Sequence, residues 1–398
     1  MEAIDRFLRY VSFDTQSDEN SQTVPSTAKQ KLLGEELARE LRELGLRDAG
    51  MDENGYVYGF LPPSEGREDV LGLISHMDTA PGVSGANVRP RVELFTGEDL
   101  ELGAGVVLSE KDFPFLAKYR GRELIVTDGT TLLGADDKAG VAEIVSAVAY
   151  FAEHPELPHK GVAVCFTPDE EIGSGADHFD FSRFPAKVAY TVDGGELGEI
   201  EYENFNAASV RVKVHGLNIH PGSAKNRMKN AALLLHEWIS LFPSAETPAH
   251  TEGYEGFYHL CEMAGDESEA KASMIVRDHD RALFEARKNT VERITRYLNE
   301  KYGEGTFELE MRDSYYNMKE KILPHMELID NARAAMEAVG VEPNVVPIRG
   351  GTDGARLSYE GLPCPNLCTG GMNFHGVHEC IPVFALERMT RVLIELLK

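Results

Sequence analysis

Four short apolar runs, each followed directly or within three residues by His, Asp or Glu, stand out in the hydrophobic pattern of the chain. They occupy residues 70–75, 131–135, 161–166 and 188–192. Uninterrupted apolar runs of this length are typical of strands that are buried on both faces of a sheet. Ligands of an open α/β sheet bind outside the carboxyl ends of its parallel strands, so these polar strand ends predict one shared site.

Segments with helical periodicity lie before, between and after these apolar runs. Apolar residues recur at helical spacing in residues 2–10, 27–44, 139–152, 325–339 and 383–397. The alternation of strands and helices predicts an α/β fold with a mostly parallel, mixed sheet. Residues 81–122 are instead rich in Gly and Pro with little periodicity, and we expect an irregular, functional excursion there.

The pattern changes after Asp193. Strands are predicted at residues 209–215, 257–263, 272–277 and 306–311, with helices at 226–242 and 281–302. This order, β-α-β-β-α-β, is the ferredoxin-like arrangement. We therefore predict a ferredoxin-like lid or substrate domain at residues 206–313. It is inserted into a catalytic domain formed by residues 1–205 and 314–398.

The composition narrows the class of protein. The 398 residues carry a formal net charge of −26, which disfavours nucleic acid and anionic membranes as partners. The pattern contains neither a signal-peptide core nor an apolar stretch of about 20 residues, so we expect no secretion and no membrane span. The five cysteines form no C-x-x-C pair, and we expect reduced thiols in a cytoplasmic protein.

The polar residues at the strand ends are potential metal ligands. They are His76, Asp78, Asp136, Asp137, Glu170, Glu171 and Asp193, joined by His375, His378 and Glu379 near the C-terminus. A set of His, Asp and Glu suits Zn²⁺, Mn²⁺ or Co²⁺ and is too rich in nitrogen for a Ca²⁺ or Mg²⁺ cage. Single features have plain alternatives, because an acid at a helix start stabilises the helix and a lone His-x-Asp occurs by chance on surfaces.

These residue types also predict a division of labour. Neighbouring side chains diverge, so one of Glu170 and Glu171 can bind a metal while the other faces the attacking water as general base. A shared site needs one bridging carboxylate, for which we choose Asp136. Asp78 can accept the second imidazole N–H of His76 and fix its tautomer. Two divalent cations held by three carboxylates keep surplus positive charge, which stabilises a bridging hydroxide and a tetrahedral oxyanion.

Six motifs together resemble the M20 metallopeptidase family. They are SHMDTAPGVSG, TDGTTLLGADDKAGVAE, TPDEEIGSGA, NIHPGSAKNRMKNA, IRGGTDGARLS and NFHGVHE, in this order. The resemblance covers nearly the whole chain, inserted domain included. It implies two zinc ions per chain, with Mn²⁺ or Co²⁺ as substitutes.

The resemblance also implies a role for each site residue. His76 and Asp193 would bind one metal, Glu171 and His375 the other, and Asp136 both, with Glu170 as general base and Asp78 as orienting residue. The family pattern of a His four residues before a Glu favours His375, and His378 is the alternative. The pattern Asp-x-Lys favours Asp136 over Asp137.

Three further residues are candidates for binding substrate. The resemblance suggests that His220, in the inserted domain, hydrogen-bonds the developing oxyanion. Arg349 could pair bidentately with a peptide carboxylate, and Arg277 is a weaker candidate of the same kind. The implied activity is removal of the N-terminal residue from tripeptides by a monomer or homodimer. An N-acyl-amino-acid deacylase, a dipeptidase and a catalytically silent binding protein are the alternatives.

Overall fold

The computed structural model describes residues 2–398, and the chain divides into two compact units. The first unit contains the chain up to Tyr202 together with Glu320–Val346 and Thr352–Lys398. The second contains Glu203–Lys319 and Pro347–Gly351. The last segment differs from the sequence-based boundaries, which placed it in the catalytic domain. It belongs to the second unit because Ile348 donates its N–H to the carbonyl of Glu203 at 2.8 Å.

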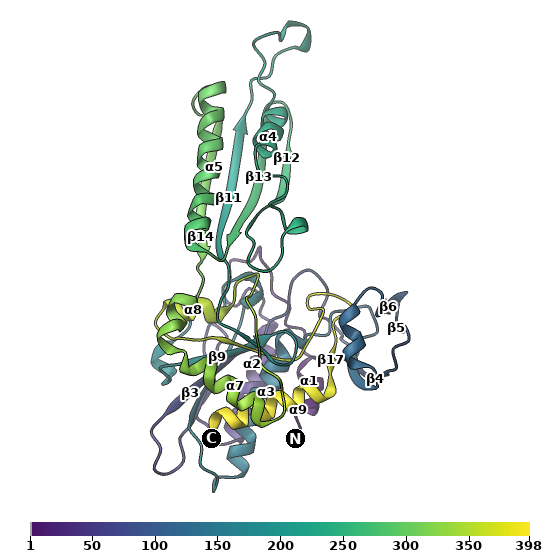
Figure 1. The fold of residues 1–398 in the computed structure, drawn as a ribbon, viewed down its shortest axis with the longest axis vertical. Coiled ribbons are helices and arrows are strands. Elements are labelled where there is room, and N and C mark those ends of the chain that lie inside the picture. The colour runs from purple at the N-terminus through teal and green to yellow at the C-terminus, as the bar shows by residue number, and fades with distance from the viewer. Residues whose placement is uncertain (1) are drawn as a thin grey trace. The chain divides into compact units, whose positions relative to one another are not determined.

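The first unit is built on an eight-stranded mixed sheet with the order β1-β2-β8-β3-β9-β16-β10-β15. Figure 1 labels its strands β3 and β9. Its strands are β1 Arg47–Met51, β2 Val57–Leu61, β3 Val70–His76, β8 Gly161–Thr167, β9 Ala189–Gly194, β10 Glu199–Glu201, β15 Asn344–Val345 and β16 Asn366–Cys368. The neighbours β8, β3, β9 and β16 run parallel, whereas β1 and β2 form an antiparallel hairpin. Three predicted ligand strands, β3, β8 and β9, therefore end at the same edge of the sheet.

Helices cover this sheet. They are α1 Ala3–Tyr10, α2 Gln30–Glu43, α3 Ala135–Glu153, α6 Lys319–Ile322, α7 Glu327–Ala338, α8 Asp353–Tyr359 and α9 Val383–Leu397. Helix α3 packs against β3 and β9 and also against α1 and α9, so almost all of its side chains are buried. This explains its Ala-rich, nearly uninterrupted apolar sequence. Among the described residues, no helix combines the length and apolar character needed to cross a membrane.

Residues 131–135 do not form the predicted strand. The strand in this region is β7 Arg122–Val126, and the chain then turns and enters α3. The N–H of Leu132 donates to Ser84, and the N–H of Leu133 donates to the carboxylate of Glu379. The apolar run is buried as expected, but its main chain pairs with a turn and a side chain instead of a neighbouring strand.

The excursion at residues 81–122 is more regular than predicted. It contains β4 Arg91–Phe95, a hairpin of β5 Leu100–Gly103 and β6 Val106–Leu108, and a 3₁₀ turn at Pro114–Tyr119. Strand β4 joins β7 and β17 Ile381–Pro382 in a separate three-stranded sheet. Its apolar side chains form a small core with Phe95, Leu108 and Leu124. The Gly and Pro residues thus mark turns between short strands.

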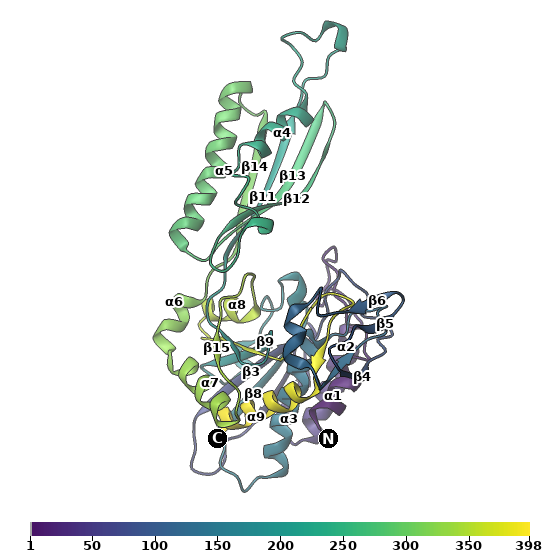
Figure 2. The ribbon, with the colours of Figure 1, turned by 45° about the vertical axis from the view of Figure 1, so that its right-hand side comes forward.

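The second unit has the predicted ferredoxin-like order (Figure 2). Its elements are β11 Asn206–His215, α4 Ala231–Ser240, β12 Phe257–Gly265, β13 Glu269–Asp278, α5 Arg281–Tyr302 and β14 Phe307–Tyr315. The strands form an antiparallel sheet in the order β12-β13-β11-β14. Trp238 of α4 and Phe284 of α5 both pack in one core with the inward residues of this sheet, so the two helices cover the same face.

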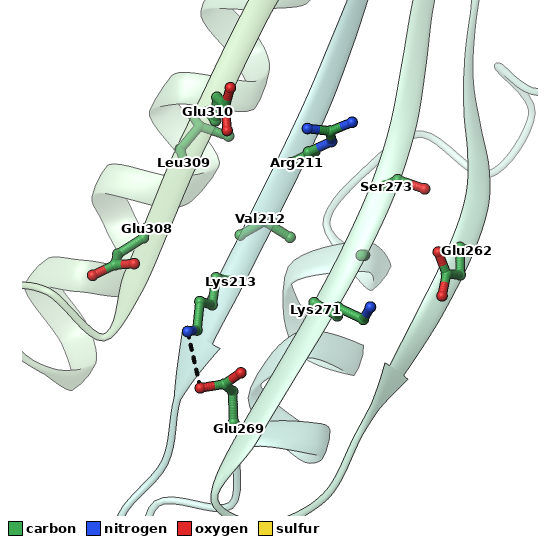
Figure 3. Close-up of a pocket in the computed structure, with 11 residues that line it drawn as sticks. Arg211, Val212, Lys213, Glu262, Glu269, Lys271, Ser273, Glu308, Leu309 and Glu310 are labelled. Atoms are coloured by element: carbon green, nitrogen blue, oxygen red, sulfur yellow. Dashed lines mark ion pairs between the residues drawn. The ribbon is translucent and has the colours of Figure 1, made fainter. Parts of the chain in front are cut away.

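The opposite face of this sheet is exposed and highly charged. Figure 3 shows a shallow pocket on it, where cationic side chains of β11 and β13 stand beside glutamates. Lys213 and Glu269 form an ion pair of 3.0 Å in which both side chains are about half exposed. Charges of both signs alternate across the strands and neutralise one another. This arrangement explains the alternating sequence of β11 and is typical of a solvated sheet face.

Candidate active site

A cluster of acids and histidines lies at the carboxyl edge of the large sheet. His76 is the last residue of β3, and Asp193 is the fifth of six residues in its parallel neighbour β9. This adjacency brings the Nε2 atom of His76 to 3.2 Å from an oxygen of Asp193. Two of the four predicted strand ends therefore meet because their strands are hydrogen-bonded neighbours.

Asp136 lies between two histidines. One of its carboxylate oxygens is 2.9 Å from Nε2 of His76, and the other is 2.9 Å from Nε2 of His375. The same His375 nitrogen is 3.0 Å from an oxygen of Glu171. The five predicted ligands thus form two groups that share Asp136, with His76 and Asp193 on one side and Glu171 and His375 on the other.

The donor atoms of this cluster fit a pair of divalent cations. Two ligand atoms on one tetrahedral zinc ion lie about 3.3 Å apart, given metal–ligand distances of about 2.0–2.1 Å. The separations of 2.9–3.2 Å between the imidazole nitrogens and the carboxylates are close to this value. The second oxygen of Glu171 is buried and makes no hydrogen bond to the described residues, which leaves it available as a ligand atom.

The acids and histidines of the cluster shift one another's pKa values. Burial lowers the pKa of His76, but the charge of Asp193 and hydrogen bonds to its carboxylate neighbours outweigh this effect and raise the pKa well above its usual value. Hydrogen bonds to Asp136 and Glu171 raise the pKa of His375 to about 11. Both rings are therefore basic, and binding of a cation at these nitrogens would compete with binding of a proton.

Asp78 supports both halves of the Glu170–Glu171 turn. Its carboxylate accepts the N–H of Glu170 at 3.0 Å and that of Glu171 at 3.1 Å. The same carboxylate lies 3.3 Å from Nδ1 of His76, whose ring also faces the Asp78 carbonyl at 3.1 Å. Asp78 therefore contacts the His76 ring and also fixes the main chain of the turn, and the second of these contacts is not evident from the sequence.

Glu170 and Glu171 occupy different environments, although they are neighbours. Burial raises the pKa of Glu171 to about 7, and the hydrogen bond to His375 opposes this shift. Burial together with the charge of Asp193 raises the pKa of Glu170 well above the usual value for a carboxyl group. Glu171 points at a histidine of the ligand cluster, whereas Glu170 lies in a desolvated environment beside another acid, which raises its pKa.

The structure distinguishes His375 from His378, the two histidines that the sequence offers as alternative ligands. Nε2 of His375 faces Asp136 and Glu171, whereas the ring of His378 packs 5.0 Å from that of Phe113. His375 adopts a left-handed backbone conformation with φ of 63°, which is uncommon for a residue other than glycine and occurs mostly at functional turns. The geometry thus brings His375, and not His378, to the cluster.

Asp136, which is partly buried, and Asp137, which is fully buried, both lie beside His76, but they face it differently. The carboxylate of Asp137 accepts the main-chain N–H of His76 at 3.0 Å, and its other oxygen has no partner among the described residues. Asp137 also lies near enough to His76 and Asp193 to complete a ligand group. Asp136 alone faces both histidines. Neither acid caps α3 through its side chain, so the helix-capping alternative does not describe them.

The candidate residues of the second unit make contacts of their own. Nδ1 of His220 accepts the N–H of Gly222 at 3.2 Å, so in the neutral ring the proton is on Nε2 and can be donated. A guanidinium nitrogen of Arg277 donates to the hydroxyl of Tyr315. These residues belong to the second unit, whereas the ligand cluster belongs to the first.

Arg349 differs from its predicted role. Its two terminal nitrogens donate to the carbonyls of Gly253 and Glu255 and to the carbonyl and hydroxyl of Thr251, at 2.6–3.3 Å. The guanidinium also lies over the ring of Phe205. Because those N–H groups already donate hydrogen bonds, the guanidinium has no free pair of N–H groups for a carboxylate in this conformation. Arg349 instead stabilises the 251–255 turn.

Comparison with known proteins identifies the class of enzyme. Residues 119–398 match the peptidase family M20/M25/M40, and these residues include most of the ligand cluster. Curated relatives also align along the full chain. The chain therefore belongs to this peptidase family and is a metallo-exopeptidase.

Two of these relatives are named peptidase T. The protein of Clostridium acetobutylicum is 54% identical over 401 residues, which cover 100% of this chain and 98% of the relative. That of Desulfitobacterium hafniense strain Y51 is 55% identical over 399 residues, covering 99% and 97%. Insertions and deletions are therefore few along the whole chain.

Solved structures share the fold. A tripeptidase from Staphylococcus aureus superimposes with a TM-score of 0.80 at 22% identity, covering 100% of this chain and 97% of that one. The aminopeptidase PepT from Bacillus cereus gives 0.78 at 22% identity with the same coverage. A dinuclear metal-binding peptidase of the M20 family from Bacillus subtilis gives 0.65 at 14% identity, covering 99% and 96%. These likenesses confirm the predicted architecture.

Proposed function

We propose that this enzyme is a di-zinc aminopeptidase that removes the N-terminal residue from tripeptides. The observation that carries the proposal is the position of Asp136, whose two oxygens each face a different histidine at 2.9 Å. A single carboxylate shared in this way suits a two-cation site and would be costly to bury otherwise. The full-length similarity to peptidase T, together with the tripeptidase of the same fold, supports tripeptides as the substrate class.

The ligand cluster defines which residues would hold the cations. His76 and Asp193 would bind one cation, Glu171 and His375 the other, and Asp136 both. Bound cations supply Lewis-acid polarisation of the scissile carbonyl and lower the pKa of a water molecule. Asp78 keeps Nε2 of His76 directed at the cluster, because it accepts from the opposite side of the ring.

Glu170 is the residue proposed to move the proton. Burial and the charge of Asp193 raise its pKa above the usual value for glutamate, which is the direction that general acid–base catalysis near neutral pH requires. Glu170 takes a proton from the attacking water and delivers it to the nitrogen of the leaving amine. Its main chain is fixed by Asp78, so the carboxyl group can act without first being ordered.

His220 and Arg277 are the residues of the second unit that we propose to bind substrate. The Nε2–H of His220 is oriented to donate and suits a carbonyl oxygen on which negative charge develops. Arg277 supplies positive charge for a peptide carboxylate, and Arg349 shapes the neighbouring turn. The five free cysteines, four of them buried, support a reducing compartment such as the cytoplasm.

The test is the release of free amino acids from three substrates of matched chemistry. Ala-Ala-Ala, Ala-Ala and N-acetyl-alanine are incubated with the protein as purified, after chelation, and after zinc is restored. We expect rapid release of one alanine from the tripeptide, loss of activity on chelation, and recovery with zinc. Faster cleavage of N-acetyl-alanine would make the protein a deacylase. Binding of the tripeptide without cleavage under any metal condition would make it a silent binding protein.

A further inference from the structure

Helix α8 begins inside the motif IRGGTDGARLS, whose residues 352–358 have no assigned role so far, and it contacts the loop that carries Glu170 and Glu171. We propose that Arg356 and Asp353, both on α8, are positioning residues that hold the Glu170–Glu171 turn in its catalytic geometry. The inference rests on the proposed function only for its kinetic readout. The contacts themselves lie within the first unit.

Arg356 holds the residue that closes the turn. Glu170–Ile172 form a short 3₁₀ turn, and Gly173 closes it by donating its N–H to the carbonyl of Glu170 at 2.7 Å. One nitrogen of Arg356 donates to the carbonyl of Gly173 at 2.7 Å, and the other pairs with the carboxylate of Asp177. A planar guanidinium that engages both groups fixes direction as well as distance.

Asp353 holds the loop at two further points. Its carboxylate accepts the hydroxyl of Thr167, the last residue of β8, at 2.9 Å. Gly175 lies so close to the same carboxylate that a Cβ at this position would overlap it. Residues on both sides of the Glu170–Glu171 turn therefore rest on one buried side chain, which is only 4% exposed.

Helix α8 is itself fixed to the strand that carries Asp193. A Cβ at Gly354 would lie 2.9 Å from the hydroxyl of Thr191 in β9. The packing is close because Gly354 has no side chain. One short helix therefore connects the strand of a proposed metal ligand to the turn of the proposed base, and it sets the distance between them.

The opposite side of the loop is held independently of α8. Asp169 accepts hydrogen bonds from the N–H and hydroxyl of Ser26 and from the amide of Gln30, at 2.5–2.7 Å. Asp78 holds the two glutamate N–H groups. Loss of Arg356 should therefore leave the loop folded but less precisely placed.

The expected effects of Arg356 on stability and on reaction rate distinguish a positioning role from a general contribution to folding. The side chains of Arg356 and Asp177 are 33% and 39% exposed, and ion pairs that are exposed to this extent contribute little to stability. In contrast, a misplacement of about 1 Å at a catalytic group can cost about 10²-fold in rate. Truncation of Arg356 should thus affect turnover far more than folding.

The experiment compares Arg356→Ala with a matched control, Arg67→Ala. Arg67 is 28% exposed, pairs with Asp69 at 2.8 Å and donates to the main-chain carbonyl of Lys398, at a distance in sequence and structure from the glutamate turn. For Arg356→Ala we expect kcat for the tripeptide to fall between about tenfold and 10²-fold. KM, zinc content and melting temperature should stay near the wild-type values, and Arg356→Lys should recover part of the loss. Arg67→Ala should leave kcat unchanged.

A second readout does not depend on catalysis. Hydrogen exchange of the amides in residues 167–177 should be faster in Arg356→Ala than in Arg67→Ala or wild type. Asp353→Asn, which keeps an acceptor for Thr167, should exchange more slowly than Asp353→Ala. If the wild-type protein cleaves no peptide, the proposed function fails. The exchange comparison still tests whether Arg356 and Asp353 hold the Glu170–Glu171 turn. Unchanged exchange, unchanged kcat, or loss of zinc in Arg356→Ala would each overturn the positioning role.

Discussion

Glu379 accepts the main-chain N–H of Asp136 at 3.1 Å, and its carboxylate also accepts the N–H groups of Leu133 and Gly134 at 2.7 and 2.8 Å. Glu379 lies four residues after His375, which contacts the Asp136 side chain. One segment of chain, from His375 to Glu379, therefore holds both the side chain and the main chain of Asp136. His375 meets the carboxylate of Asp136, and Glu379 fixes the backbone that presents it.

Replacing Glu379 with Ala should weaken both folding and metal binding. Three buried N–H groups would lose their acceptor, and each unsatisfied group costs about 1–3 kcal/mol. We expect the free energy of unfolding to fall by about 3 kcal/mol or more, and metal affinity to fall by about 10–100-fold, as for other residues that orient ligands. Denaturant unfolding and metal titration measure the two effects.

Glu337→Ala, an exposed glutamate on α7, is the control for Glu379→Ala and should leave both quantities unchanged. Glu379→Gln keeps one carbonyl oxygen and should lie between wild type and the Ala variant. If Glu379→Ala unfolds and binds zinc like the wild type, the three hydrogen bonds do not set the position of Asp136.

His375 and His378 provide a direct test of the ligand assignment. His375→Ala should lose one of two zinc ions per chain and most activity, because its Nε2 is the nitrogen that faces Asp136 and Glu171. His378→Ala should keep both ions, since its ring packs on Phe113. Elemental analysis of the two purified variants measures the zinc content. The opposite pattern would show that the histidines exchange roles.

The elements with strong periodicity are those that the sequence predicts accurately. The predicted helices at 281–302 and 383–397 coincide with α5 and α9, because each has a continuous apolar face and a clear end. The predicted strand at 131–135 was wrong. Its apolar pattern is real, but its main chain bonds to Glu379, more than 200 residues later, and local pattern carries no information about such a partner.

The same division applies to the candidate site. The ligand candidates follow from residue type and from their place at strand ends, because their side chains act there directly. Glu379 and Asp353 act on main chain or side chains from distant parts of the sequence, so spacing does not reveal which groups they hold. A signal exists for Glu379, since an acid followed by Cys380-Ile381 at the start of an apolar stretch is unlikely to be solvated. The free fork expected of Arg349 depended on the conformation of residues 251–255, which no pattern specified.

Glu170→Gln should separate proton transfer from metal binding. The amide keeps the size of the side chain but cannot accept and deliver a proton, and general acid–base catalysis contributes about 10²–10⁴-fold. We expect kcat to fall by at least that factor while zinc content and KM change little. Steady-state kinetics and elemental analysis on the same preparation measure these quantities. Loss of a zinc ion in Glu170→Gln would mean that Glu170 is a ligand and that Glu171 is the base.

The burial of Glu143 should make the free energy of unfolding depend on pH. This residue of α3 is fully buried, and neither carboxyl oxygen has a hydrogen-bond partner among the described residues. Burial raises its pKa well above the usual value for glutamate, so the folded protein holds the proton at pH values where the unfolded chain has released it. The free energy of unfolding must then fall as pH rises above about 4.5, by at most about 1.4 kcal/mol per pH unit, until the folded pKa is reached.

Glu143→Gln removes this proton release and should flatten the corresponding part of the pH profile. The variant should therefore gain stability relative to wild type between pH 5 and pH 8, with the larger advantage at pH 8. Other buried acids, such as Glu201 with a pKa raised to about 8 by burial, titrate equally in both proteins and cancel in the difference. Glu153→Gln, an exposed glutamate of the same helix, is the matched control and should show no such gain. Urea unfolding of the three proteins at pH 5, 6.5 and 8 measures the effect, and a difference between wild type and Glu143→Gln that stays constant across this range would refute a neutral, buried Glu143.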